Sequence, residues 1–126
     1  MGKELILLDT SAVIEMLKGT SNGAKVKALI ETEKFAITSI TINETLKGQS
    51  KGRELIKEFL QSMYILPFDE AAAWESAKLD QELYEKGKPL GKLDLYIASI
   101  ALLHSIPLVS FDQNFKNVSK LQLILP

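Results

Sequence analysis

Four acidic residues of this 126-residue chain differ from its other acids because large apolar residues flank them. They are Asp9 after the run 5–8, Glu44 after 40–42, Asp94 between Leu93 and Leu95, and Asp112 after 108–111. Four partly buried carboxylates in one cleft would repel one another unless they were protonated or bound to cations. Hard divalent cations such as Mg²⁺ and Mn²⁺ prefer oxygen ligands, so the four acids form a candidate metal site.

Each of these acids also has an explanation that involves no chemistry, and these explanations stay open at this point. The structural roles would be a helix cap for Asp9, a capping box with Thr41 for Glu44, a helix-dipole contact for Asp94 and an Asx turn for Asp112. The argument for a functional site therefore depends on whether the four acids come together in the fold.

The elements that must position these acids alternate between strands and helices. The run Leu5–Leu8 has no polar face, as expected of a strand that is buried on both sides. Further strands are expected over 35–38, 64–67, 107–110 and 121–125, and helices over 11–18, around 26–30, from Thr41, over 53–60, from Asp69 to before Gly87, and over 94–103. This order predicts an α/β fold with a parallel sheet.

The sheet determines where the acids lie, because ligands bind at the carboxyl ends of strands in open α/β sheets. Asp9 and Asp112 follow strands that would be neighbours at the switch point of a doubly wound sheet. Glu44 and Asp94 would begin helices that run beneath the same edge. Polar turns or joints are expected over 20–23, 48–52 and 88–91.

Composition excludes several classes of protein. The chain has no cysteine and one histidine, which excludes disulfides, thiolate zinc sites and a cysteine nucleophile. The net charge of −1 gives no global basic signature for passive nucleic-acid binding. The N-terminal apolar run is too short for a signal peptide or a membrane helix. We therefore expect one domain over residues 1–126, located in the cytoplasm and not at a membrane.

Four motifs in this order resemble the PIN-domain family and, within it, the toxin ribonucleases of the VapC type. The motifs are Leu8–Ser11, Ser39–Glu44, Asp94–Ala101 and Leu108–Phe115. The resemblance implies a single PIN-like domain with a five-stranded parallel sheet flanked by helices. It also implies endonucleolytic cleavage of RNA that depends on Mg²⁺ or Mn²⁺, a homodimer, and inhibition by a small cognate antitoxin protein.

The chain departs from the family pattern at two positions. Asn114 stands where the family often has a further acid, and Leu93 stands where an asparagine often precedes the third acid. Both departures leave the four acids in place, but they leave open whether one or two metal ions bind.

The resemblance leads to a mechanistic hypothesis. Asp9, Asp94 and Asp112 would ligate the metal directly, and Glu44 would do so directly or through water. The metal would activate a water molecule and stabilise charge on the phosphate, so no protein nucleophile would be needed. Ser11 and Ser110 would hold the acids or a water through hydrogen bonds.

RNA would also need a basic path to an acidic cleft. Basic residues that could form such a rim are Lys47, Lys51, Arg53, Lys57, Lys86, Lys88 and Lys92, although ordinary solubilising surface charge is the favoured explanation for any single lysine among them. His104 lies near the end of the helix expected over 94–103, and this position favours a capping or helix-dipole role over a catalytic one.

Three other functions remain open. The chain could be a PIN-fold nuclease specific for structured DNA or RNA outside toxin-antitoxin systems, or a non-catalytic PIN-fold binding module. The presence of all four acids counts against the binding module. A phosphoryl-transfer enzyme with a covalent aspartate would need a second acid two residues after Asp9, where Ser11 stands.

Overall fold

The computed structural model describes residues 4–47 and 49–126, which form a five-stranded sheet, six α-helices and one 3₁₀ helix. The strands are β1 (Leu5–Leu8), β2 (Lys34–Thr38), β3 (Tyr64–Leu66), β4 (Leu108–Val109) and β5 (Leu123–Ile124). The helices are α1 (Thr10–Lys18), α2 (Ser21–Ile30), α3 (Ser39–Leu46), α4 (Arg53–Gln61), α5 (Glu70–Glu85), α6 (Lys92–His104) and the 3₁₀ helix η1 (Gln113–Asn117). The joint expected over 48–52 includes Gly48, which lies outside the described residues.

The sheet has the strand order β3-β2-β1-β4-β5, and every neighbouring pair is parallel. The predicted α/β class and five-stranded parallel sheet are therefore confirmed. Strand β1 lies at the centre, where Leu7 pairs with Ala36 of β2 and with Leu108 of β4. The Asp9 N–H continues the ladder by donating to the Val109 carbonyl at 3.0 Å. The carboxyl ends of β1 and β4 therefore lie side by side, as predicted for the strands that precede Asp9 and Asp112.

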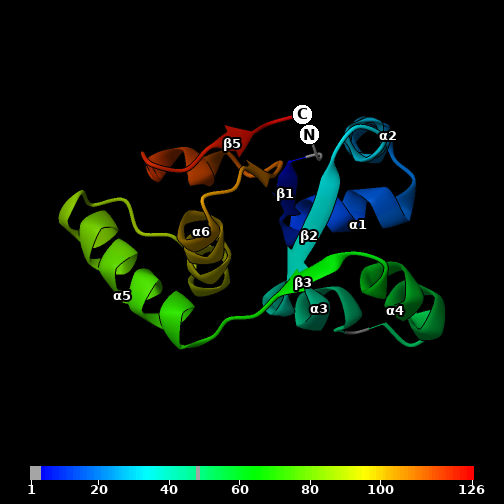
Figure 1. Ribbon diagram of the computed structural model, residues 1–126, viewed down its shortest axis with the longest axis horizontal. Helices are drawn as coiled ribbons and strands as arrows, with labels where there is room; N and C mark the ends of the chain where they lie inside the picture. Colours follow the sequence, from blue (N-terminus) through cyan, green and yellow to red (C-terminus); the bar gives the residue numbers. More distant parts are fainter. Residues whose placement is uncertain (1–3, 48) are drawn as a thin grey trace.

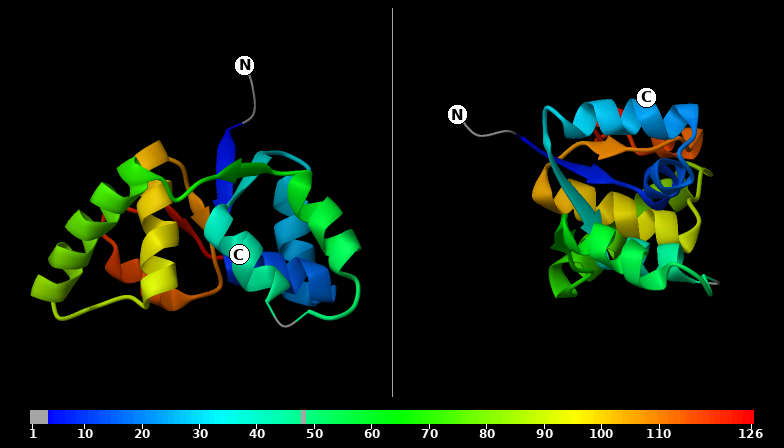
Figure 2. Two further views of the ribbon diagram at one scale, coloured as in Figure 1. Left: turned by 90° about the horizontal axis from the view of Figure 1, so that it is seen from below. Right: turned by 90° about the vertical axis from the view of Figure 1, so that its right-hand side faces the viewer.

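Two hydrophobic cores cover the two faces of the sheet. Figure 1 shows α5 and α6 on one side of the strands and α1 to α4 on the other, and the left view of Figure 2 shows the same division. Leu7 packs into the core beneath α5 and α6, whereas Ile6 and Leu8 pack into the core beneath α1, α2 and α4. Successive side chains of a strand point to opposite faces, so a central strand with two covered faces requires an unbroken apolar run.

Helix α2 begins earlier than its apolar spacing suggested. We expected a polar turn over 20–23, but the helix starts at Ser21 and is capped by Thr20, whose hydroxyl accepts from the Gly23 N–H at 3.0 Å. A Cβ on Gly23 would lie 2.2 Å from the Glu15 carbonyl oxygen. Glycine is therefore required at this position because α2 packs its first turn directly on the backbone of α1.

Helix α3 also begins earlier than expected, at Ser39 instead of near Thr41. Thr38 is the N-cap, because its hydroxyl accepts from the Thr41 N–H at 3.2 Å. The capping box expected between Thr41 and Glu44 is therefore wrong, and Glu44 lies inside α3 instead of at its start. Its side chain is free for a role that does not involve capping.

Thr45 presents a buried hydroxyl that has no hydrogen-bond partner among the described residues. The residue is 3 % exposed, so the hydroxyl is removed from water without compensation. We expect Thr45→Val, which keeps the shape of the side chain, to increase the free energy of unfolding by about 1 kcal/mol. Urea denaturation of both proteins measures the change, and a loss of stability would show that the hydroxyl has a partner in solution.

Candidate active site

Asp9 lies at the junction of β1 and α1 and is 3 % exposed. It is the N-cap of α1, since its Oδ1 accepts from the Ala12 N–H at 2.9 Å. Oδ1 also accepts from the Ser11 hydroxyl at 2.7 Å, and Oδ2 accepts from the Ser110 hydroxyl at 2.5 Å. The capping role therefore accounts for only part of the environment of this carboxylate, because Ser110 reaches it from the neighbouring strand.

Two serines connect Asp9 to the segment that follows β4. Ser11 accepts from the Phe111 N–H at 3.2 Å, and Ser110 accepts from the Asp112 N–H at 2.9 Å. Each hydroxyl therefore donates to Asp9 and accepts from the backbone of the Asp112 segment. The two serines were expected to hold the acids or a water, and both of them contact Asp9.

Asp112 caps the 3₁₀ helix η1 through its Oδ1, which accepts from the Asn114 N–H at 2.9 Å. The Asx turn expected at this position is present. The Asp112 side chain also lies close enough to Asp94 to raise the pKa of the Asp94 carboxyl. Asp112 therefore forms the Asx turn and also lies next to another acid. Its role in the turn does not exclude a role in a metal site.

Asp94 is half-buried in the first turn of α6, which begins two residues earlier than expected, at Lys92. Burial, and after it the charges of Asp112, Asp9 and Glu44, together raise the pKa of Asp94 from 3.8 to about 6. Asp94 therefore experiences the charge of all three other acids. The four residues, although distant in sequence, form one acidic group at the carboxyl edge of the sheet.

Asp9 has a similar electrostatic environment. Burial raises the pKa of Asp9 above its ordinary value, although hydrogen bonds from Ser110, Ala12 and Ser11 lower it. The charge of Asp112 adds to the increase. The fold thus keeps two acids in surroundings that disfavour their ionised forms, which is the arrangement expected of a site that binds cations or handles protons.

Glu44 reaches the group from α3. Its Oε1 accepts from the Thr10 hydroxyl at 2.7 Å, and the Thr10 oxygen lies 3.0 Å from the Thr41 oxygen. The sequence analysis missed Thr10 and interpreted Thr41 as a cap. The available signals were the position of Thr10 directly after Asp9 and the three-residue spacing from Thr41 to Glu44.

The four acids interact electrostatically, but their side chains do not converge as a complete set of metal ligands. Within residues 4–47 and 49–126, no three acidic, cysteine or histidine side chains converge closely enough to hold one metal ion. The electrostatic coupling acts over a longer range than direct coordination, so the two observations are compatible. The donor set fits Mg²⁺ or Mn²⁺, because it offers hard carboxylate oxygens whose mutual repulsion a cation would relieve.

The raised pKa of Asp94 predicts how stability depends on pH. Below about pH 4 the group is protonated in both the folded and the unfolded chain, so it costs no stability. As the pH rises from 3.8 through 6, the unfolded chain ionises first and the metal-free folded protein is progressively destabilised. We expect the Tm of Asp94→Asn to exceed that of the unaltered protein by an amount that grows between pH 4 and pH 7.

Thermal unfolding in EDTA across that pH range measures the difference between the two Tm values. The comparison cancels contributions from titrating groups that do not interact with Asp94, because they are common to both proteins. A Tm difference that stays constant from pH 4 to pH 7 would contradict the raised pKa of Asp94.

One residue of the expected basic rim, Arg53, has a structural role. Arg53 donates from Nη1 to the carbonyls of Leu46 and Gln49, at 2.7 and 3.1 Å, and so fastens the connection between α3 and α4. Lys47 and Arg53 line a groove of about 360 Å³ on α3. The remaining lysines of the expected rim are exposed: Lys51, Lys57, Lys86, Lys88 and Lys92. His104 is the last residue of α6, which agrees with a position at a helix end.

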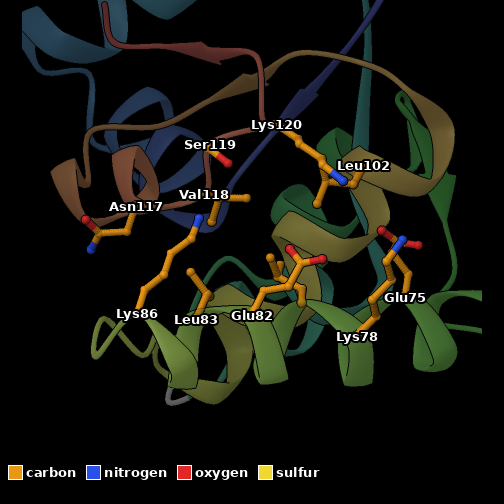
Figure 3. A pocket seen from close by; sticks show the side chains of 11 residues that line it. Glu75, Lys78, Glu82, Leu83, Lys86, Leu102, Asn117, Val118, Ser119 and Lys120 are labelled. Atoms are coloured by element: carbon orange, nitrogen blue, oxygen red, sulfur yellow. The ribbon is translucent and has the colours of Figure 1, made fainter.

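The cavity drawn in Figure 3 is separate from the acidic group. It lies between α5, α6 and the segment after η1. Its charged lining residues are Glu75, Lys78, Glu82, Lys86 and Lys120. A volume of about 20 Å³ accommodates a water molecule and excludes a nucleotide. None of the four acids lines this cavity, so it is not part of the candidate site.

The comparison with known proteins agrees with this fold. The PIN domain model matches residues 6–121, so the chain belongs to the PIN domain family, and its relatives place it in the VapC group. The tRNA(fMet)-specific endonuclease VapC of Shigella flexneri is 26 % identical over 92 % of this chain and 93 % of its own. Ribonuclease VapC1 of Methanocaldococcus jannaschii is 30 % identical over 93 % of this chain and 81 % of its own.

Solved structures show the same likeness. VapBC2 from Rickettsia felis, bound to a DNA fragment from its promoter, includes a chain that superposes with a TM-score of 0.79 and 28 % identity. The match covers 95 % of this chain and 97 % of that one. Among the described residues, no helix combines the length and the apolar character that crossing a bilayer requires.

Proposed function

We propose that this chain is a metal-dependent endoribonuclease, the toxin of a VapBC-type pair, which hydrolyses RNA phosphodiesters at the site formed by Asp9, Glu44, Asp94 and Asp112. The observation that carries the proposal is the half-buried Asp94, on which the charges of the other three acids converge. Such a group needs a cationic counter-charge, and a divalent metal ion would supply it. The relatives that are named ribonucleases and endonucleases support RNA as the substrate.

Asp9, Asp94 and Asp112 would hold Mg²⁺ or Mn²⁺ directly, and Glu44 would do so directly or through water. When bound, the ion supplies positive charge next to the scissile phosphate and activates water for hydrolysis. No cysteine is present, and the serines at the site are occupied with Asp9 instead of being paired with a histidine. The chemistry therefore fits hydrolysis without a protein nucleophile.

The protein's own residues hold the site in position. Ser11 and Ser110 fix the Asp9 carboxylate and align it with the backbone that carries Asp112. Asp94 lies in the first turn of α6, where the helix dipole favours its negative charge. Each acid is thus attached to a strand end or a helix turn, and rigid elements of this kind can hold reacting groups in a defined geometry.

The proposal includes partners. The structural neighbours include several toxin-antitoxin complexes, which supports a small cognate antitoxin as the inhibitor of this chain. We also propose that the toxin acts in the cytoplasm as a homodimer. Exposed aromatic side chains on α5, Trp74 and Tyr84, are available to such an interface. Sedimentation of the purified chain measures the oligomeric state, and a monomer at micromolar concentration would contradict the homodimer.

The experiment that tests the proposed activity is cleavage of a mixed pool of single-stranded RNA by the purified protein. Parallel reactions contain Mg²⁺, Mn²⁺ or EDTA, with Asp9→Asn as the matched variant. We expect cleavage with either metal and none with EDTA or with Asp9→Asn. Cleavage that persists in EDTA would contradict the metal-dependent mechanism, and cleavage by Asp9→Asn at the original rate would contradict the site. If no RNA is cleaved although the metal binds, a DNA substrate or a binding module becomes the better explanation.

A further inference from the structure

Three threonine hydroxyls form a continuous chain that ends on Glu44. The Thr38 hydroxyl lies 3.4 Å from the Thr41 oxygen, which lies 3.0 Å from the Thr10 oxygen. The Thr10 hydroxyl then donates to Glu44 Oε1 at 2.7 Å. Thr38 and Thr41 have no exposed surface, so solvent does not compete with the chain at these two residues.

The chain can run in only one direction. Each hydroxyl has a single proton, and Thr10 donates its proton to the Glu44 carboxylate. Thr41 must therefore donate to Thr10, and Thr38 must donate to Thr41. The Thr38 oxygen in turn accepts from the Thr41 N–H at 3.2 Å, which anchors the chain at the N-cap of α3.

This chain connects two acids that come from separate segments. Thr10 directly follows Asp9 and is the first residue of α1, whereas Thr41 and Glu44 belong to α3. The position of the Glu44 carboxylate relative to Asp9 is therefore fixed through one peptide bond and one hydroxyl contact between the helices. Oε2 of Glu44 has no hydrogen-bond partner among the described residues and remains available to a ligand.

We propose that Thr10 and Thr41 are positioning residues that hold the Glu44 carboxylate in the acidic group through this chain of hydroxyl hydrogen bonds. The inference rests on the proposed function, because it assigns the threonines a role in the metal affinity of that site. Replacing a residue that orients a metal ligand typically weakens metal binding or activity 10- to 100-fold. The role is distinct from that of Ser11 and Ser110, which contact Asp9 and not Glu44.

The test is isothermal titration of the full chain with MnCl₂ alone, without RNA. We expect Thr10→Val, which keeps the shape and removes the hydroxyl, to weaken Mn²⁺ binding at least 10-fold. Thr10→Ser retains the donor and is expected to stay within about threefold of the unaltered protein. Thr45→Val is the matched control, because its hydroxyl lies on α3 beside Glu44 but has no partner among the described residues.

A double-mutant cycle separates positioning from a general structural effect. If Thr10 acts through Glu44, Thr10→Val has no further effect on Mn²⁺ affinity in a chain that already has Glu44→Ala. An equal loss in both backgrounds would overturn the inference, because it would mean that Thr10 acts by another route. If Thr10→Val does not fold, Thr41→Val replaces it, and its effect on Mn²⁺ affinity is compared with and without Glu44→Ala.

The outcomes also distinguish this inference from the proposed function. Unaltered Mn²⁺ affinity in Thr10→Val, together with a clear loss in Asp94→Asn, would overturn the positioning role alone. Absence of Mn²⁺ binding by the unaltered chain would overturn the metal-dependent site and the positioning role with it.

Discussion

Replacing Asp94 with asparagine is expected to reduce RNA cleavage at least about 100-fold while the fold stays intact. Asp94 is the acid on which the charges of the other three converge, so its loss removes both a proposed metal ligand and part of the negative potential of the site. Asparagine has nearly the same size and retains one carbonyl oxygen. The change also removes a half-buried charge, so we expect stability at pH 7 to rise by on the order of 1 kcal/mol.

The measurement is the initial rate of cleavage of single-stranded RNA with Mg²⁺ in excess, with circular dichroism of the same samples. Glu58→Gln is the control, because Glu58 is an exposed acid on α4 and its replacement changes the net charge by the same amount. Full activity in a folded Asp94→Asn protein would contradict the assignment of this residue to the active site.

Gly23→Ala is expected to cause a large loss of stability, although the residue lies outside the site. The added Cβ would lie 2.2 Å from the Glu15 carbonyl oxygen and 2.9 Å from the Met16 Cα. Both contacts are with backbone, which cannot move aside without separating α2 from α1. We expect a loss of about 3 kcal/mol, at the upper end of what overpacking costs, even though alanine is the better helix former.

Gly91→Ala is the matched control, since a Cβ at Gly91 meets no atom within 4 Å and the φ of this residue is −58°. Urea denaturation of both variants gives the two free energies of unfolding. We expect the Gly91 variant to lose less than about 1 kcal/mol, because only the capping preference changes. Equal stabilities of the two variants would show that α1 and α2 do not approach as closely as described.

Most of the fold was predictable because local signals agree with the final packing. The apolar run before Asp9 requires a strand that is covered on both faces, and the two cores on either side of Leu7 and Leu8 fulfil that requirement. Gly19 ends α1 in a left-handed conformation with φ 68°, and Asp69 caps α5, as their residue types suggested.

The beginnings of α2 and α3 were not predictable, because tertiary contacts decide them. The segment over 20–23 has the composition of a turn, and only the close packing on Glu15 shows why Gly23 belongs to a helix. Thr41 and Glu44 have the spacing of a capping box, but the cap is Thr38. The sequence contains several possible caps, and the register of the preceding strand selects among them.

The candidate site was predictable as a set of residues but not as a geometry. The neighbouring positions of Asp9 and Asp112 followed from sheet topology, and both Ser11 and Ser110 contact Asp9. The contact between Thr10 and Glu44 joins residues 34 positions apart on two helices. No local pattern encodes the relative rotation of α1 and α3, so this contact becomes visible only in the folded chain.

The four carboxylates at the edge of the sheet are proposed to bind a catalytic divalent metal ion, and the most direct test is calorimetric titration with Mn²⁺. We expect saturable binding by the unaltered chain, and an affinity at least 10-fold weaker in Asp9→Asn, Asp94→Asn and Asp112→Asn. Glu58→Gln should bind as the unaltered chain does. Equal Mn²⁺ affinity in all five proteins, or no binding by the unaltered chain, would contradict the account.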